Sequence, residues 1–361
     1  MSPFKQALLS DPTSLKAGFE QATRIAMHEA NQRCGGRKPQ EPDIVAMLVL
    51  EGVPYIANTL RAITAPFGIR TTVSSVFCHQ KPEVLFNRRG YAPDRCELGD
   101  ILLVHRHSDA RGRPMESNAL LLQAKLCGAA AHTIPAREQH QLRLYQDWPL
   151  FEYSRSGPRL SGKTRNVTPK RRHSGAQYLL IDDGALGPAA GGLLGLRGTH
   201  CMAVWPAEPV LYPSISLAEE LLRFFLGLTG RSFQDRVPAN ANNWDTVVWD
   251  LLQHSLGFVF NRKNAGIRRQ PRAGGDPLAS SLSLMNFCVV GDDVDVDDND
   301  GQQQALLKQA LLKRFGTVLQ QGGREPPNQG QLLEQDAEDA GGVSVVLIET
   351  RDGENHREWA R

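Results

Sequence analysis

Two apolar stretches, ELGDILLV at 97–104 and ALLLQAKL at 119–126, decide how this chain folds. Apolar runs of this length, bounded by polar residues, predict two neighbouring β-strands. The segment between them, HRHSDARGRPMESN at 105–118, holds a glycine, a proline and several charges, which is typical of a long hairpin loop. We therefore expect an antiparallel hairpin in which the start of the first stretch lies beside the end of the second.

Three polar residues are set into these apolar strands. Because side chains alternate between the two faces of a strand, Gln123 and Lys125 point to the same face, and the hairpin brings Asp100 beside them. A carboxylate and an amide oxygen suit a magnesium ion, which activates water and neutralises developing charge when a phosphodiester bond breaks. Lys125 would orient the water or stabilise charge on the phosphate. The alternative for so short a motif is an ordinary ion pair between Asp100 and Lys125, or an exposed polar face.

The elements around the hairpin follow a recognisable order. The segment EPDIVAMLVL at 41–50 begins with a proline and acids in its first turn, which are helix-start signals. Strand-forming residues follow at 70–77. After the hairpin we expect a helix at 135–145 and short strands at 178–182 and 201–205. The predicted order is helix, three strands, helix, strand, which is an α/β class.

This order, with Asp100 on the second strand and Gln123 and Lys125 on the third, resembles the PD-(D/E)XK nuclease superfamily, over roughly residues 41–210. The resemblance implies a restriction-endonuclease-like core, a central mixed sheet flanked by helices, with additional helical segments. It also implies magnesium or manganese as cofactor and an acidic ligand on the first helix, either Glu41 or Asp43. This chain departs from the usual pattern in having Gly99 before the aspartate and glutamine in place of glutamate.

The helix acid stays open between two residues. Glu41 and Asp43 are two apart, so they face different directions on a helix and both are not expected to reach one metal ion. Either could instead be an ordinary acid favoured by the helix dipole.

Charge is distributed unevenly along the chain. The net charge is +2, yet residues 292–361 contain 15 acidic and 7 basic residues, so the rest of the chain is strongly basic. Two loop-like clusters without internal acids, at 155–173 and 261–272, suit a phosphate backbone, with a solvated basic loop as the alternative. The expected nucleic-acid contacts are Lys81, Lys170, Arg171, Arg172, Arg262, Lys263, Arg268 and Arg269.

The remaining features bound the class of protein. The sequence has no run of roughly 18 apolar residues, its first residues are polar, and its six cysteines lack CxxC spacing, so we expect a cytoplasmic bacterial protein without a membrane span. We divide the chain into an N-terminal helical segment at 1–40, the nuclease core at 41–230, a helical and basic extension at 231–291, and an acidic linker with a C-terminal helix and strand at 292–361.

The sequence therefore predicts a nuclease for which DNA is favoured over RNA as the substrate, with RNA left as the alternative. A role in bacterial defence or DNA processing, and a homo-oligomer or an activating protein partner, are compatible with the fold class. The alternative is a protein that kept the fold but lost catalysis, and that serves as a nucleic-acid-binding or interaction module.

Overall fold

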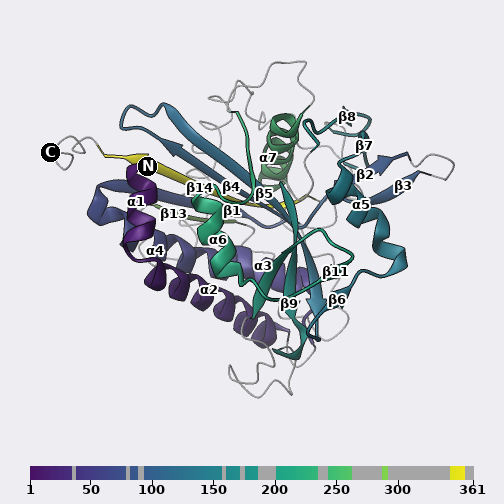
Figure 1. Cartoon of the computed structure of the whole chain (residues 1–361), viewed down its shortest axis with the longest axis horizontal. Coiled ribbons are helices and arrows are strands. Elements are labelled where there is room, and N and C mark those ends of the chain that lie inside the picture. Colours follow the sequence, from purple (N-terminus) through teal and green to yellow (C-terminus); the bar gives the residue numbers. More distant parts are fainter. Residues whose placement is uncertain are drawn as a thin grey trace.

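The computed structural model describes residues 1–34, 38–78, 82–87, 93–156, 160–170, 175–185, 201–234, 243–261, 287–291 and 342–353. Within these residues, eight strands form one mixed central sheet, in the order β10-β9-β5-β4-β14-β1-β13, with β12 pairing to β5 (Figure 1). The strands are β10 Met202–Pro206, β9 Ala176–Asp182, β5 Pro114–Cys127, β4 Ile101–Ser108, β14 Ser344–Asp352, β1 Ile69–Val76, β13 Phe287–Gly291 and β12 Arg231–Ser232. The predicted α/β class, a mixed sheet flanked by helices, is confirmed.

Two small sheets accompany the central one. One has the order β3-β2-β7-β8, and the other pairs β6 with β11. Their strands are β2 Glu83–Phe86, β3 Asp94–Glu97, β7 Phe151–Ser154, β8 Thr164–Arg165, β6 His132–Thr133 and β11 Val210–Leu211.

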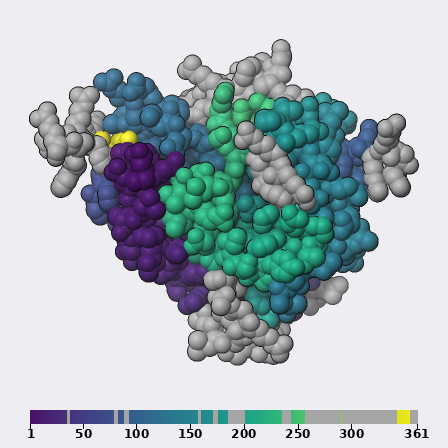
Figure 2. Space-filling model, viewed as in Figure 1, coloured from purple at the N-terminus to yellow at the C-terminus, as the bar shows by residue number. Residues whose placement is uncertain are grey.

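Helices cover both faces of the central sheet. They are α1 Pro3–Ser10, α2 Pro12–Arg33, α3 Glu41–Met47, α4 Val53–Thr64, α5 Gln139–Asp147, α6 Leu217–Phe225 and α7 Trp244–Asn261, with short turns at Leu48–Gly52, Ala65–Phe67, Ala136–Glu138 and Asp183–Ala185. Figure 2 shows the purple N-terminal helices against the green region that carries α6, and α2 packs directly on α6.

Alternation along the strands builds two separate cores, one on each face of the sheet. Leu120 and Leu122 of β5 pack with α1 to α4 and α6. Ala119 and Leu121, on the opposite face, pack with α5, α7 and the sheet that contains β2. Gln123 continues the second set, so it faces α5.

The hairpin is real but its loop is shorter than predicted. β4 and β5 stay paired to Ser108 and Pro114, so the connection is 109–113 rather than 105–118. Charge and polarity in that segment indicated a loop. The polar side chains instead find partners in the fold, because β14 lies beside β4 and α1 packs over it.

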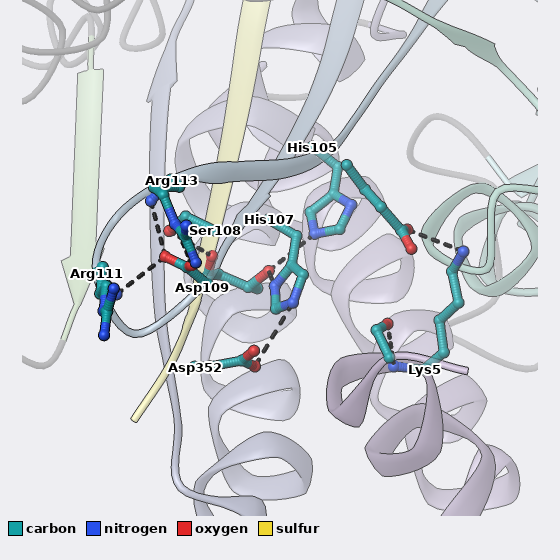
Figure 3. A network of polar contacts seen from close by, with 11 residues as sticks. Lys5, His105, His107, Ser108, Asp109, Arg111, Arg113 and Asp352 are labelled. Atoms are coloured by element: carbon teal, nitrogen blue, oxygen red, sulfur yellow. Dashed lines mark hydrogen bonds and ion pairs between the residues drawn. The ribbon is translucent and has the colours of Figure 1, made fainter. Parts of the chain in front are cut away.

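That packing creates a buried polar cluster beneath α1 (Figure 3). The imidazoles of His105 and His107 each lie 3.0 Å from the Thr350 hydroxyl oxygen, and Nε2 of His107 lies 3.5 Å from a carboxylate oxygen of Asp352. The Phe4 ring covers both histidines, with ring centroids 4.7 Å and 5.6 Å away. Burial, together with smaller contributions from the neighbouring His107 and Lys5, lowers the pKa of His105 to about 3.

The strand β14 brings the C-terminal part of the chain into the central sheet. It runs parallel to β4 and antiparallel to β1, and so lies between these two strands. The sheet therefore extends beyond the expected 41–230 core into both C-terminal segments, since β13 and β14 come from them. The sequence of β14, an apolar run at 345–348 followed by polar residues, gave no indication of which strands it would pair with.

The helical run Glu41–Phe67 is long and apolar enough, by length and composition, to cross a membrane, but 72% of its most apolar window is buried inside the protein. Ser75 of β1 donates a hydrogen bond to the carbonyl of Val49, within the π-helical turn, at 2.7 Å. These contacts are those of a core helix.

Candidate functional site

A group of polar residues gathers where β4 begins and β5, still paired with β9, extends beyond β4. The N–H of Asp100 donates to the Leu122 carbonyl at 2.9 Å, and β4 pairing starts at Ile101 opposite Leu122. Past that point the N–H groups of Ala124 and Leu126 have no β4 carbonyl to meet. Buried backbone donors require an acceptor, and two carboxylates supply it.

Asp100 and Glu41 are those carboxylates. Oδ2 of Asp100 accepts from the Ala124 N–H at 2.7 Å, and Oε1 of Glu41 accepts from the Leu126 N–H at 3.0 Å. Successive donors on one strand edge thus hold an acid from the start of β4 and an acid from α3 next to each other. The hairpin brings Asp100 to the Gln-x-Lys strand as the sequence predicted.

Gln123 lies buried between Asp100 and helix α5. Its Nε2 donates to Oδ2 of Asp100, and its Oε1 accepts from Nε2 of Gln141. Gln141 also donates to the Glu97 carbonyl at 3.2 Å. In this arrangement the amide nitrogen of Gln123 faces the carboxylate, so ligation of a metal by its oxygen requires the amide to turn over.

Lys125 lies on the same face as Gln123 and is half-buried. Its Nζ forms an ion pair with Oε2 of Glu138 at 2.9 Å. Burial alone would lower the pKa of Lys125, but Glu41, Glu138 and Asp100 outweigh burial and raise it. Lys125 therefore stays a charged ammonium group, suited to bind an anion or orient water rather than to accept a proton.

Acidic charge exceeds basic charge around this lysine. Burial raises the pKa of Asp100 to about 8, and the nearby carboxylates of Glu97 and Glu41 add to the rise, while the Ala124 N–H and Lys125 oppose it. The pKa of Glu97 is also raised, first by burial, with Lys125 opposing. Carboxylates that repel one another in this way gain stability from a bound cation.

The two candidate acids on α3, Glu41 and Asp43, make different contacts in the structure. Glu41 reaches the end of β5, whereas Asp43 is buried and accepts a hydrogen bond from the Gln40 N–H at 2.9 Å, which closes the first turn of α3. The Cys34 thiol also donates to Asp43. Asp43 is thus a helix-capping residue, and the expectation that it could serve as the ligand is not supported by its position.

The residue before Asp100 has a steric explanation. A Cβ on Gly99 would lie 2.8 Å from the Leu121 side chain and 3.0 Å from the Tyr145 hydroxyl oxygen. Tyr145 needs that place because its hydroxyl donates to the Leu98 carbonyl at 2.7 Å. Glycine lets α5 approach the strand closely.

Sequence reasoning missed the residues that α5 and β3 bring to the site: Glu97, Glu138, Gln141 and Tyr145. The last three are spaced three and four apart, which places them on one face of a helix. That periodicity was the available signal. The helix was predicted, but its polar residues gave no indication of which face it turns to the sheet.

Most of the predicted nucleic-acid contacts lie outside the described residues: Lys81, Arg171, Arg172, Arg262, Lys263, Arg268 and Arg269. Lys170 is described and exposed. Two other cations of its cluster are paired with acids distant in sequence, contrary to the expectation of unpaired charge. Arg165 contacts buried Asp250 at 2.6 Å, and exposed Arg155 lies 3.7 Å from Glu83.

The donor set fits a hard divalent cation. Asp100 and Glu41 each use one carboxylate oxygen for a backbone hydrogen bond, and magnesium is commonly held by one or two carboxylates while it keeps several waters. Within the described ranges, no group of three or more His, Cys, Asp or Glu side chains is placed to hold a metal ion by itself. These residues therefore fit a metal ion that keeps several water ligands, and they do not fit a structural ion bound by protein ligands alone.

Comparison with known proteins adds no relative: no family model, curated protein or solved structure matches the chain.

Proposed function

We propose that this protein is a metal-dependent nuclease with a restriction-endonuclease-like core, acting on DNA. The observation that carries the proposal is the convergence of Asp100, Glu41, Gln123 and Lys125 at the end of β5, beyond its pairing with β4. The order of elements supports the same core: α3 and α4 precede β1, then come β4, β5, α5 and β9, with β9 parallel to β5. The strand β14, between β1 and β4, is an addition to that core.

The residues take distinct roles in this proposal. Asp100 and Glu41 would hold magnesium or manganese, and Gln123 would offer its amide oxygen once the amide had turned. When bound there, such an ion would supply a lowered pKa for an attacking water and positive charge against that developing on the phosphate. The ammonium of Lys125 binds a phosphate oxygen or orients that water. Gln141 holds the Gln123 amide in the orientation that the structure shows, with its nitrogen toward Asp100, so the Gln141 amide would turn together with that of Gln123.

A second candidate is a nuclease-like protein without catalysis that binds nucleic acid or a partner. The observation in its favour is the closed hydrogen-bond chain from Gln141 through Gln123 to Asp100, which uses the amide and one carboxylate oxygen without a metal. Replacement of a charged ligand by glutamine weakens the attraction for a cation, and this is the direction expected if catalysis was lost.

A cleavage assay separates the two candidates. Plasmid and linear DNA are incubated with the protein in magnesium, in manganese and in chelator, beside the Asp100→Asn and Lys125→Met variants. The nuclease proposal expects metal-dependent cleavage that each substitution lowers by orders of magnitude, with DNA binding retained. Retained DNA binding without cleavage in either metal supports the second candidate, whereas normal cleavage by Asp100→Asn contradicts the assigned roles.

A further inference from the structure

Glu138 is the direct partner of Lys125, and nothing in the chemistry of phosphodiester cleavage requires an acid there. Its carboxylate lies 2.9 Å from Nζ of Lys125 and comes from the turn that opens α5. The turn is fixed, because the Glu138 N–H donates to the Pro135 carbonyl at 2.9 Å. A carboxylate at the start of a helix is also favoured by the helix dipole.

Besides Glu138 and Glu97, the carboxylates near Lys125 are the two proposed to hold the metal, Glu41 and Asp100. The ammonium group interacts electrostatically with Glu41 and Asp100 as well as with Glu138. A lysine side chain has a flexible four-carbon stem, so it can move to whichever carboxylate attracts it most. Without Glu138, the strongest remaining attraction comes from Asp100 and Glu41, where the ammonium would take the place of the cation.

We infer that Glu138 is a positioning residue that holds Lys125 away from Asp100 and Glu41 and so preserves the affinity of these carboxylates for a divalent cation. This inference rests on the proposed function, since it presupposes the metal site. Glu138, in the turn that precedes α5, would thus prevent Lys125 from competing with the metal ion for the same carboxylates. This role depends on a contact that only the folded structure shows. Residues that orient metal ligands from outside typically change metal affinity by about 10- to 100-fold when replaced.

The test is a double-mutant cycle on manganese binding, measured by calorimetry on the full chain without DNA. Glu138→Ala should raise the Kd for Mn²⁺ by about 10- to 100-fold in the chain that has Lys125. The same substitution should leave the Kd unchanged in a Lys125→Met background, because the competing ammonium is absent. Glu138→Gln, which keeps a hydrogen-bond acceptor for Lys125, should weaken binding less than Glu138→Ala.

A matched control is Glu152→Ala, which removes an exposed glutamate of β7 and should not change the Kd. Circular dichroism of each variant establishes that it is folded, and Glu138→Gln serves if Glu138→Ala does not fold. Unchanged Mn²⁺ affinity in Glu138→Ala overturns the inference and leaves the proposed nuclease intact. Equal weakening in both backgrounds also overturns it, because Glu138 would then act independently of Lys125. No Mn²⁺ binding by the wild-type chain overturns the metal site and this inference together.

Discussion

Replacing His105 with phenylalanine should remove much of the protein's sensitivity to acid. His105 is 2% exposed and packs between Phe4 and Phe225, with ring centroids 4.7 Å and 5.4 Å away. Another aromatic ring can occupy this place, and Thr350 keeps its contact with His107. Because phenylalanine is larger than histidine, the substitution should cost about 1–3 kcal/mol at neutral pH, and this cost should be the same at every pH.

The magnitude follows from the pKa of the imidazole in the two states. The pKa of His105 is about 3 in the folded protein, against an ordinary value near 6.5, so the unfolded chain binds the proton first as the pH falls. Stability is therefore fully present above about pH 6.5 and is lost as the pH falls towards 3. At about pH 4.5 the loss through this one residue is about 3 kcal/mol.

Urea unfolding followed by tryptophan fluorescence, at several values between about pH 7.5 and 4.5, measures this difference. The wild-type free energy of unfolding should fall more steeply with acid than that of His105→Phe, by about 3 kcal/mol over the range. Substituting the exposed His28 by Gln is the control and should leave the slope unchanged. If wild type and His105→Phe lose stability in parallel, His105 is not buried as a neutral group and the description of the cluster beneath α1 is wrong.

Three other outcomes are expected. Gln123→Glu should tighten Mn²⁺ binding several-fold by calorimetry, since it adds a negative charge; an unchanged affinity would mean that residue 123 is not a ligand. Arg165→Met should lower the free energy of unfolding by about 3–5 kcal/mol in urea titration, because it leaves a buried carboxylate unpaired; a change below about 1 kcal/mol would refute the buried ion pair. Replacing Lys170, Arg171 and Arg172 together by Ala should weaken DNA binding and reduce the slope of log affinity against log salt by up to about 0.9 per lost phosphate contact; identical salt titrations would exclude this loop.

The hairpin and its polar residues could be predicted from the sequence because they depend on local alternation. Gln123 and Lys125 are two apart on a strand, and antiparallel pairing with the preceding strand fixes the neighbour of each residue. This pairing predicts that Asp100 lies beside Gln123 and Lys125. The choice between Glu41 and Asp43 could not be made from the local sequence. It depended on which side chain could reach the N–H of Leu126, which has no acceptor on β4.

Residues brought by distant pairing escaped prediction. β14 enters the middle of the sheet more than 200 positions after β4, and the sequence of a single strand does not specify which strands it will pair with. Thr350 and Asp352 of β14 contact the imidazoles of His105 and His107. These contacts allow the polar segment that follows Val104 to form a buried strand rather than a loop. The contact of Glu138 with Lys125 also escaped prediction. Helical periodicity predicts that polar residues share one face of a helix, but it does not predict which lysine that face contacts.

The most direct test of the proposed metal site is a crystal structure of the protein soaked in manganese, with anomalous diffraction used to place the ion. We predict an anomalous peak for a manganese ion bound by carboxylate oxygens of Asp100 and Glu41. The Gln123 amide should be turned so that its oxygen faces the ion, and Lys125 should still be paired with Glu138. An absence of anomalous density at the end of β5 in saturating manganese, with Gln123 still donating to Asp100, would contradict the metal-dependent nuclease.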